Sequence, residues 1–291
     1  MGERDIASAF DVLIERSVPT ETERQAAARH RQSVESALEG LGVFGLWESG
    51  SFHHGTGVRG HCDVDVIVSL KGDRPSDPDT ALVRVRSALE ARFPYTTIRV
   101  SRPAVVVDFA GGAERWEVIP GYYQRTTGDW SVYSIPAPGG TWMDTAPSAH
   151  LDYVNRQNAY PAGGAKRLAR LMKAYKYANS RGFRVSSFYL EMRAARYMAD
   201  ESSFLAWVDF LRLGDALVAS GLASMQDPTG VTGLIRATST EASRHDALTR
   251  LEADLARTRD ALALEKAGRR TEAFAKMEYV FIGGTFPARF Y

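Results

Sequence analysis

The stretch from Gly50 to Leu70, GSFHHGTGVRGHCDVDVIVSL, joins a glycine-serine pair to two aspartates that stand one residue apart. The polar-apolar alternation of DVDVIVSL, Asp63 to Leu70, predicts a strand that enters a buried sheet. Residues two apart on a strand project from one face about 7 Å apart, so the carboxylates of Asp63 and Asp65 share a face. Two carboxylates beside a buried sheet repel each other and lose hydration, which a cation normally offsets. Such oxygen ligands suit magnesium, with manganese as the alternative.

A phosphate-binding turn is predicted directly upstream of the aspartates. Gly50 allows the backbone to approach a phosphate closely, and Ser51 offers both an N–H and a hydroxyl donor. Donors at one end and metal ligands at the other fit a nucleoside triphosphate with its magnesium ions. The alternative is that Ser51 caps a helix and the aspartates form surface ion pairs. The joint occurrence of both features favours the nucleotide site.

Composition and charge limit the class of protein. The chain has 291 residues and is 44% hydrophobic, which predicts two domains. Its formal net charge of +1 predicts no overall attraction to long nucleic acid. The single cysteine, Cys62, cannot form an internal disulfide and is expected to be a small packed residue. No apolar run is long enough to span a bilayer, so we expect a cytoplasmic protein without membrane association.

The two halves of the chain differ in pattern. The first half mixes an expected helix over 21–38, introduced by the capping-box pair Thr20 and Glu23, with strand-like runs such as AVVVDFAGGAERWEVIPGYY, a predicted hairpin. From about Asn155 onward the apolar periodicity is helical. The predicted fold class is α/β (α+β), with a mixed-sheet core over residues 1–154 and a mainly helical lobe over residues 155–291.

Several of these segments resemble a known family. GSFHHGTGVRGHCDVDVIV is similar to the Gly-Ser and paired-acid motif of the polymerase-β-type nucleotidyltransferases. Its Gly55-Thr56 pair resembles, more narrowly, the bacterial cGAS/DncV-like nucleotidyltransferases (CD-NTases), which are related to oligoadenylate synthetases. YSIPAPGGTWMDTAPSAHLDYV is similar to the family's crossing segment, and FIGGTFP resembles its usual close. The resemblance implies a two-lobed polymerase-β-like nucleotidyltransferase core followed by an oligoadenylate-synthetase-like helical lobe, with the active site between the lobes.

The resemblance also nominates a third acid. RWEVIPGY is similar to the segment in which the family places it, which points to Glu117, although most relatives carry aspartate there. Asp108 is the rival: if Gly111-Gly112 form a two-residue turn, Asp108 faces Arg115 and Val106 faces Glu117, so both acids lie on one sheet face. An ion pair with Arg115 would give Asp108 a structural role, whereas Glu117 has no evident partner, which favours Glu117. The predicted catalytic and metal-binding residues are Asp63, Asp65 and Glu117.

The helical half resembles family segments that bind the donor nucleotide. In the family, a lysine and a serine hold the triphosphate and the next residue stacks on the base; the matching residues are Lys173, Ser187 and Phe188. An ammonium offsets phosphate charge, a hydroxyl donates, and stacking on an aromatic face is worth ~1–3 kcal/mol. Phe188 in the core, with Tyr189 as the stacking residue, is the alternative. The predicted nucleotide-binding residues are Gly50, Ser51, Thr56, Lys173, Ser187 and Phe188.

The resemblance implies an enzyme: a nucleotidyltransferase that joins nucleoside triphosphates by two-metal nucleotidyl transfer into a cyclic di- or trinucleotide second messenger. In bacterial relatives that messenger serves antiphage (CBASS) signalling. ATP is the expected substrate, with GTP and other nucleoside triphosphates left open, and the expected cofactor is Mg²⁺ or Mn²⁺.

Partners and alternative functions follow from the same resemblance. A regulatory protein partner is left open, and we expect a monomer. No long nucleic-acid activator is expected, because the chain lacks a zinc-binding insertion and a strongly basic spine. One alternative function is a nucleotidyltransferase that modifies a small molecule, a protein or an RNA end. The other is a non-catalytic nucleotide-binding protein. Base choice and the 2′-5′ or 3′-5′ linkage are not legible from the sequence.

Overall fold

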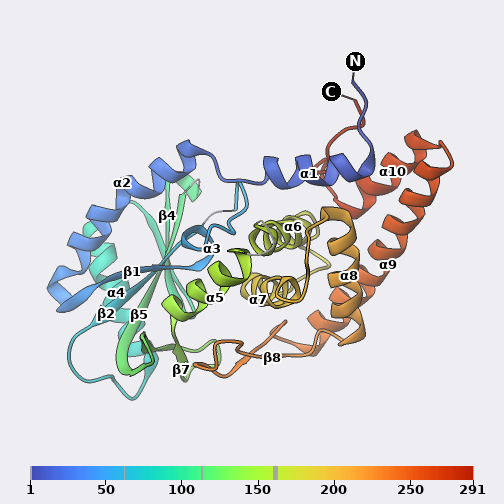
Figure 1. Cartoon of the computed structure of the whole chain (residues 1–291). Coiled ribbons are helices and arrows are strands. Elements are labelled where there is room, and N and C mark those ends of the chain that lie inside the picture. Colours follow the sequence, from blue (N-terminus) through green and yellow to red (C-terminus); the bar gives the residue numbers. More distant parts are fainter. Residues whose placement is uncertain (1, 62, 113, 160–162, 291) are drawn as a thin grey trace. The chain divides into compact units, whose positions relative to one another are not determined.

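The computed structural model describes residues 2–61, 63–112, 114–159 and 163–290, and the chain divides into two compact units (Figure 1). The sheet unit comprises residues 19–152 and 229–233, and the helical unit comprises residues 1–18, 153–228 and 234–291. The functional domains predicted at 1–154 and 155–291 stay a prediction. The compact units differ from them by placing residues 1–18 with the helices and residues 229–233 with the sheet. Cys62 lies outside the described residues.

The sheet unit is a mixed sheet with helices, which confirms the predicted α/β class. Its elements in chain order are α2 (Glu21–Leu38), a 3-10 turn (Glu39–Leu41), β1 (Val43–Ser49), α3 (Gly50–His53), β2 (Asp63–Leu70), α4 (Pro78–Arg92), β3 (Thr97–Ser101), β4 (Ala104–Phe109), a 3-10 turn (Ala110–Gly112), β5 (Glu114–Thr127), β6 (Trp130–Pro136), β7 (Trp142–Thr145) and the start of α5 (Pro147–Ala159).

The strand order places β2 and β5 at the centre of the sheet. The order is β1-β2-β5-β4-β3, and the far end of the long strand β5 pairs with β6, which pairs with β7. β2 runs parallel to β5, while the other pairings are antiparallel. The predicted hairpin of β4 and β5 is confirmed, and its register pairs Asp108 with Arg115 and Val106 with Glu117, as predicted. The connection is a 3-10 turn over Ala110–Gly112 rather than a two-residue turn.

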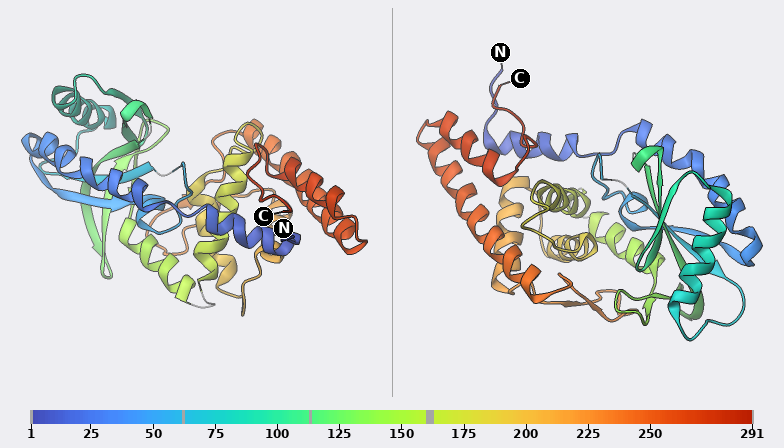
Figure 2. Two further views of the ribbon diagram at one scale, coloured as in Figure 1. Left: turned by 90° about the horizontal axis from the view of Figure 1, so that it is seen from above. Right: turned by 180° about the vertical axis from the view of Figure 1, so that it is seen from behind.

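One face of this sheet is covered by α2 and α4, which lie side by side on it (Figure 2). The expected capping box is present, since Thr20 and Glu23 each bond the other's backbone N–H at the start of α2. Side chains alternate along a strand, and the residues of β2 that enter this core are its even-numbered ones, Val64 to Leu70. The core contains Val34, Leu38, Val64, Val66, Val68, Leu82, Val85, Leu89, Trp116 and Val118.

The helical unit contains both ends of the described chain. Its elements are α1 (Ile6–Arg16), the end of α5, α6 (Gly164–Ala178), α7 (Ser187–Met198), α8 (Ala206–Ala219), β8 (Met225–Gln226), β9 (Leu234–Ile235), α9 (Glu241–Lys266) and α10 (Arg270–Val280). Figure 2 shows α9 and α10 as an antiparallel pair. The two-residue strands β8 and β9 were not predicted, because they are too short to give an alternating pattern. No helix in the described ranges has both the length and the apolar character needed to cross a membrane.

Helix α1 belongs to this unit because its apolar face completes an aromatic core. The ring of Phe10 contacts the rings of Phe210, Phe281 and Phe286 at centroid distances of 5.5, 5.8 and 5.4 Å. The apolar face of α6 lies in the same core, with four of its side chains fully buried. These four are Leu168, Leu171, Met172 and Tyr175.

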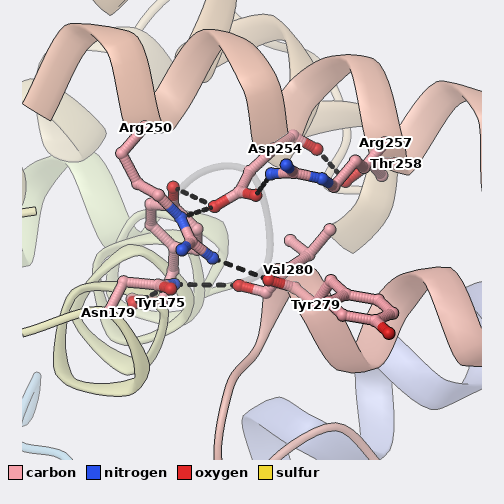
Figure 3. Close-up of polar contacts among 8 residues, drawn as sticks. All are labelled: Tyr175, Asn179, Arg250, Asp254, Arg257, Thr258, Tyr279 and Val280. Carbon is pink, nitrogen blue, oxygen red and sulfur yellow. Dashed lines mark hydrogen bonds and ion pairs between the residues drawn. The ribbon is translucent and has the colours of Figure 1, made fainter. Parts of the chain in front are cut away.

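A buried carboxylate ties α6 to α9 (Figure 3). Asp254 on α9 is fully buried and accepts hydrogen bonds from the hydroxyl of Tyr175 at 2.8 Å, from Nη1 of Arg257 at 2.7 Å and from Nε of Arg250. Burial, reinforced by this carboxylate, raises the pKa of Tyr175 far above its ordinary value, so the phenol remains a donor. Arg250 also donates to the carbonyl oxygen of Tyr279 at 2.6 Å, which extends the contact to α10.

Removal of this carboxylate should destabilise the helical unit. In Asp254→Ala the buried hydroxyl of Tyr175 and two guanidinium groups lose their shared acceptor, so we expect the free energy of unfolding to fall by about 2–4 kcal/mol in urea titrations. Asp215→Ala is the matched control, because Asp215 on α8 forms an exposed ion pair with Arg259 of α9. That variant should change stability by less than about 0.5 kcal/mol, and equal losses in both variants would contradict the assigned role.

Candidate active site

The predicted acids lie on the sheet face opposite α2 and α4. Asp63 and Asp65 begin β2, and parallel pairing sets Asp63 beside Arg115 and Asp65 beside Glu117 on β5. Directly paired residues point to the same side of a sheet, and the valines that alternate with the acids fill the core on the other side. Antiparallel pairing with β4 adds Asp108 to this face, opposite Arg115. Four carboxylates therefore share a small area of sheet with Arg115, and Arg99 of β3 lies on the same face beside Asp108.

The glycine-serine turn lies against Asp65. Gly50 begins the short helix α3 with φ +70°, a backbone conformation that L side chains rarely adopt. A Cβ added to Gly50 would lie 1.8 Å from Oδ2 of Asp65, so the carboxyl group packs directly on the glycine backbone. The Oγ of Ser49, the residue paired with Asp65, donates to the Asp65 carbonyl oxygen at 3.4 Å. Gly50 therefore packs on a carboxylate, and the close approach to a phosphate expected of it stays a prediction.

Thr56 holds the segment after this turn. Its N–H donates to the carbonyl oxygen of Ser51 at 2.9 Å, and its Oγ1 reaches the same oxygen at 3.4 Å. Thr56 is fully buried, while Ser51 is half-buried. The chain thus folds back on α3. The nucleotide contacts expected of Ser51 and Thr56 stay predictions.

Arg115 lies among the acids. Its Nη2 donates to Oε1 of Glu117 at 2.7 Å, and its Nε lies 3.8 Å from Oδ1 of Asp63. Partial burial lowers the pKa of Arg115, but the charges of Asp63, Glu117 and Asp108 outweigh burial and raise that pKa above its ordinary value. The guanidinium is therefore firmly charged and neutralises part of this face.

The expected partners of the two rival acids were wrong. The sequence argument gave Asp108 an ion pair with Arg115 and left Glu117 without a partner. In the structure Glu117 accepts the hydrogen bond from Arg115, and Asp108 pairs with Nε of Arg99 on β3 at 3.7 Å. A long side chain on β5 can turn along its own strand toward Glu117 as readily as across to β4, and register alone does not decide between these directions.

The donor chemistry of this face fits a divalent cation. Carboxylate oxygens from Asp63, Asp65 and Glu117 are the ligands that magnesium prefers, and strand pairing places them on adjacent positions. Within the described ranges, however, no group of three or more His, Cys, Asp or Glu side chains is arranged to hold a metal ion. The types of these residues and their positions on the strands suit a magnesium ion. Their carboxyl groups, however, point elsewhere: that of Glu117 toward Arg115, and that of Asp65 toward Gly50.

In the helical unit, Lys173 is buried in an ion pair. Lys173 and Glu191 are 1% and 2% exposed, and the Nζ of Lys173 donates to Oε2 of Glu191. Breaking such a buried pair is costly, because either charge alone would remain poorly solvated. The triphosphate contact expected of Lys173 stays a prediction.

A second lysine contacts the predicted serine. The Nζ of Lys176 donates to the Oγ of Ser187, and the hydroxyl of Tyr177 lies 3.4 Å from the same oxygen. The sequence argument missed Lys176, although it lies three residues after Lys173, where a helix places neighbours on one side. Phe188 is half-buried at the edge of the core, while Tyr189 is fully buried and donates to the carbonyl oxygen of Ala223 at 2.8 Å. Phe188 is therefore the more accessible aromatic of the two.

The mixed sheet, its paired acids and the helical unit form the polymerase-β-like nucleotidyltransferase fold. Residues 5–158 match the family model of the Second Messenger Oligonucleotide or Dinucleotide Synthetase (SMODS) domain. The chain belongs to this family, which confirms the predicted membership among the CD-NTases.

Known relatives resemble the chain in sequence and in fold. A cyclic AMP-AMP-AMP synthase of Escherichia coli (strain MS 115-1) is 29% identical over 206 residues, which cover 67% of this chain and 62% of that protein. E. coli MS115-1 CdnC, solved with ATP, superposes with a TM-score of 0.78 at 18% identity over 98% of this chain and 99% of that chain. CdnC in its complex with HORMA-deltaN gives 0.77 at 17% identity over 97% and 98%.

A side chain at position 50 should disturb Asp65. Gly60 is the matched control, because its φ is +75° and an added Cβ would meet no described atom within 4 Å. Gly60→Ala should cost about 1 kcal/mol of unfolding free energy from backbone strain alone. Gly50→Ala should cost about 2–4 kcal/mol, because the Asp65 carboxyl must also move. Equal losses in urea titrations of the two variants would show that Gly50 is needed only for its φ.

Proposed function

We propose that this protein is a nucleotidyltransferase that joins nucleoside triphosphates into a cyclic di- or trinucleotide second messenger. The observation that carries the proposal is the in-register pairing of Asp65 with Glu117, next to a glycine that packs on Asp65. Paired acids beside a glycine-serine turn suit a triphosphate and its metal ions better than a structural ion pair, which would not need a glycine at that position.

Asp63, Asp65 and Glu117 are the residues proposed to hold magnesium. The chemistry supplied by bound magnesium at such a site is activation of the attacking hydroxyl and neutralisation of the pyrophosphate that leaves. An acceptor hydroxyl oxygen bonds to the α-phosphorus as the bond to pyrophosphate breaks; pyrophosphate leaves, and the hydroxyl proton passes to solvent. The protein's share in this step is orientation: Ser51 offers its N–H and hydroxyl to the phosphates, and Gly50 leaves room for the Asp65 carboxyl beside them.

The helical unit is proposed to bind the donor nucleotide. Lys176 and Ser187 form a pair of donors suited to phosphate oxygens, and Phe188 offers an aromatic surface beside them. Lys173, predicted for the same triphosphate contact, is proposed to act with them. Its ion pair with Glu191 must then rearrange or serve to place α6 against α7.

Substrates and partners are proposed from the relatives. CdnC of E. coli has been solved with ATP, which supports ATP as a substrate here. The same protein has been solved as a complex with HORMA-deltaN, which supports a regulatory protein partner for this chain. A role in antiphage signalling, a cytoplasmic location, a monomeric state and independence from long nucleic acid remain predictions from the sequence.

The two alternative functions predict different results from those expected of a cyclic oligonucleotide synthase when the protein is incubated with nucleotide. A nucleotidyltransferase for a small molecule, protein or RNA end would consume nucleotide only after that acceptor is added. A non-catalytic binding protein would bind nucleotide with magnesium but release no pyrophosphate.

Incubation with four labelled ribonucleoside triphosphates and Mg²⁺ or Mn²⁺ should give a phosphatase-resistant product, with or without the regulatory partner. Mass spectrometry and linkage-specific nucleases would identify it. Glu117→Gln should lose roughly two decades of turnover or more, at about 1.36 kcal/mol per decade, because a metal ligand is replaced by an amide. Asp108→Asn, on the same sheet face, should retain turnover.

Two results would reverse these assignments. Full turnover in Glu117→Gln together with loss in Asp108→Asn would move the third acid to Asp108. Absence of any resistant product under all conditions, with pyrophosphate release also absent, would count against the enzyme.

Lys176→Gln should raise the KM for nucleoside triphosphate about tenfold, because one charge-assisted contact to phosphate is lost. Lys276→Gln is the matched control, since Lys276 lies on an exposed face of α10 in an ion pair with Asp260. Steady-state kinetics should show no change in that control. An unchanged KM in Lys176→Gln would remove Lys176 from the proposed triphosphate site.

A further inference from the structure

Arg115 lies among the candidate metal ligands, and the proposed function gives this arginine no role. It is flanked by Asp63 on β2 and by Asp108 on β4, and Glu117 follows it two residues along β5 on the same face. Charges that are directly paired or two residues apart on a sheet face interact strongly. Arg115 is thus the central cation of a face that carries four carboxylates.

Its contacts are unequal. Nη2 makes a hydrogen bond of 2.7 Å to Glu117, whereas Nε lies 3.8 Å from Asp63. This Nε is buried and donates no hydrogen bond to any described residue. A buried N–H without an acceptor is costly, so the guanidinium is held firmly at one end and poorly at the other. Displacing this side chain therefore breaks one hydrogen bond, the one to Glu117, and frees a buried N–H that had no acceptor.

A divalent ion held by Asp63 and Glu117 would require the same carboxylate oxygens. It would also place two positive charges within a few ångströms of the guanidinium, where like charges repel. Arg115 and a metal ion are therefore alternatives at this position. The side chain is 34% exposed, so it can turn toward solvent when it leaves Glu117.

We propose that Arg115 is a tethered counter-ion that holds the acid cluster together before metal binds and must leave Glu117 when metal arrives. Arg115 is then a positioning residue that sets the affinity of the nucleotide-free enzyme for divalent cations. Arg115 thus weakens metal binding when no substrate is present. The triphosphate brings further negative charge, so metal binds more tightly once the triphosphate has arrived. The inference rests on the proposed function, because it takes these carboxylates as metal ligands.

The test measures Mn²⁺ binding to the full-length, nucleotide-free protein by electron paramagnetic resonance. Arg115→Gln should bind Mn²⁺ about fivefold more tightly or better than the wild type, because a competing charge is removed. Arg99→Gln is the matched control: Arg99 lies on the same face and pairs with Asp108, but no contact joins it to Asp63 or Glu117 among those described. Its Mn²⁺ affinity should change less than about twofold.

Thermal unfolding gives a second readout. In EDTA, Arg115→Gln should melt at a lower temperature than the wild type, because its carboxylates lose their counter-ion, and Mn²⁺ should restore more stability to the variant than to the wild type. Arg115→Lys, which keeps the charge on a differently shaped head group, should fall between the two in both measurements. It also serves as the second variant should the glutamine protein fold poorly.

The remaining outcomes separate this inference from the function beneath it. Unchanged or weaker Mn²⁺ binding in Arg115→Gln, with wild-type binding that Asp65→Asn abolishes, would overturn the counter-ion role and leave the metal site intact. Loss of nucleotide affinity in EDTA with unchanged Mn²⁺ affinity would make Arg115 a substrate contact instead, and would likewise overturn the inference. No Mn²⁺ binding in any variant would overturn both.

Discussion

The parallel pairing of β2 with β5 is the constraint on which the candidate site depends. It sets Asp65 beside Glu117 and Asp63 beside Arg115. A shift of one residue would turn the acids of one strand into the core and the valines outward, so the buried valines under α2 and α4 fix the register of the charged face. Packing on the apolar side of the sheet thus determines where the charged residues lie on the other side. The arrangement of the candidate site therefore persists only while this core stays folded.

The features of the sheet unit that could be predicted are those set by local sequence, which excludes the parallel pairing of β2 with β5. The bounds of β2, the capping box of α2 and the pairing of Asp108 with Arg115 follow from periodicity, capping chemistry and the hairpin turn. The direction of the Arg115 side chain does not follow from local sequence, because whether it pairs with Glu117 or with Asp108 depends on side-chain packing across three strands. Resemblance supplied Lys173 and Ser187, but only the structure shows that Lys176 is the lysine in contact with Ser187.

Charged residues are exposed and paired differently in the two units. On the sheet face, acids and Arg115 remain partly exposed, where charges can exchange partners at low cost. In the helical unit, Asp254 is buried with a full set of donors, and such a network fixes one arrangement of helices. The exchangeable charges lie where a metal ion is proposed to bind, and the fixed ones lie where α6 must be held in place.

The sequence did not show which unit α1 belongs to, because its partners lie 156 or more residues away along the chain. Its Ile6 N–H donates to Glu265 on α9, and Phe10 packs on Phe281. Most of the sheet unit, residues 19–152, lies in sequence between the first segment of the helical unit and its other two segments. During synthesis the sheet can therefore assemble first, while the apolar face of α1 stays only partly covered, by α6 and α8, until α9 and α10 have been made. A nascent chain that lacks the segment after α10 leaves Phe10 without two of its aromatic neighbours, Phe281 and Phe286, and such exposed apolar surface favours aggregation.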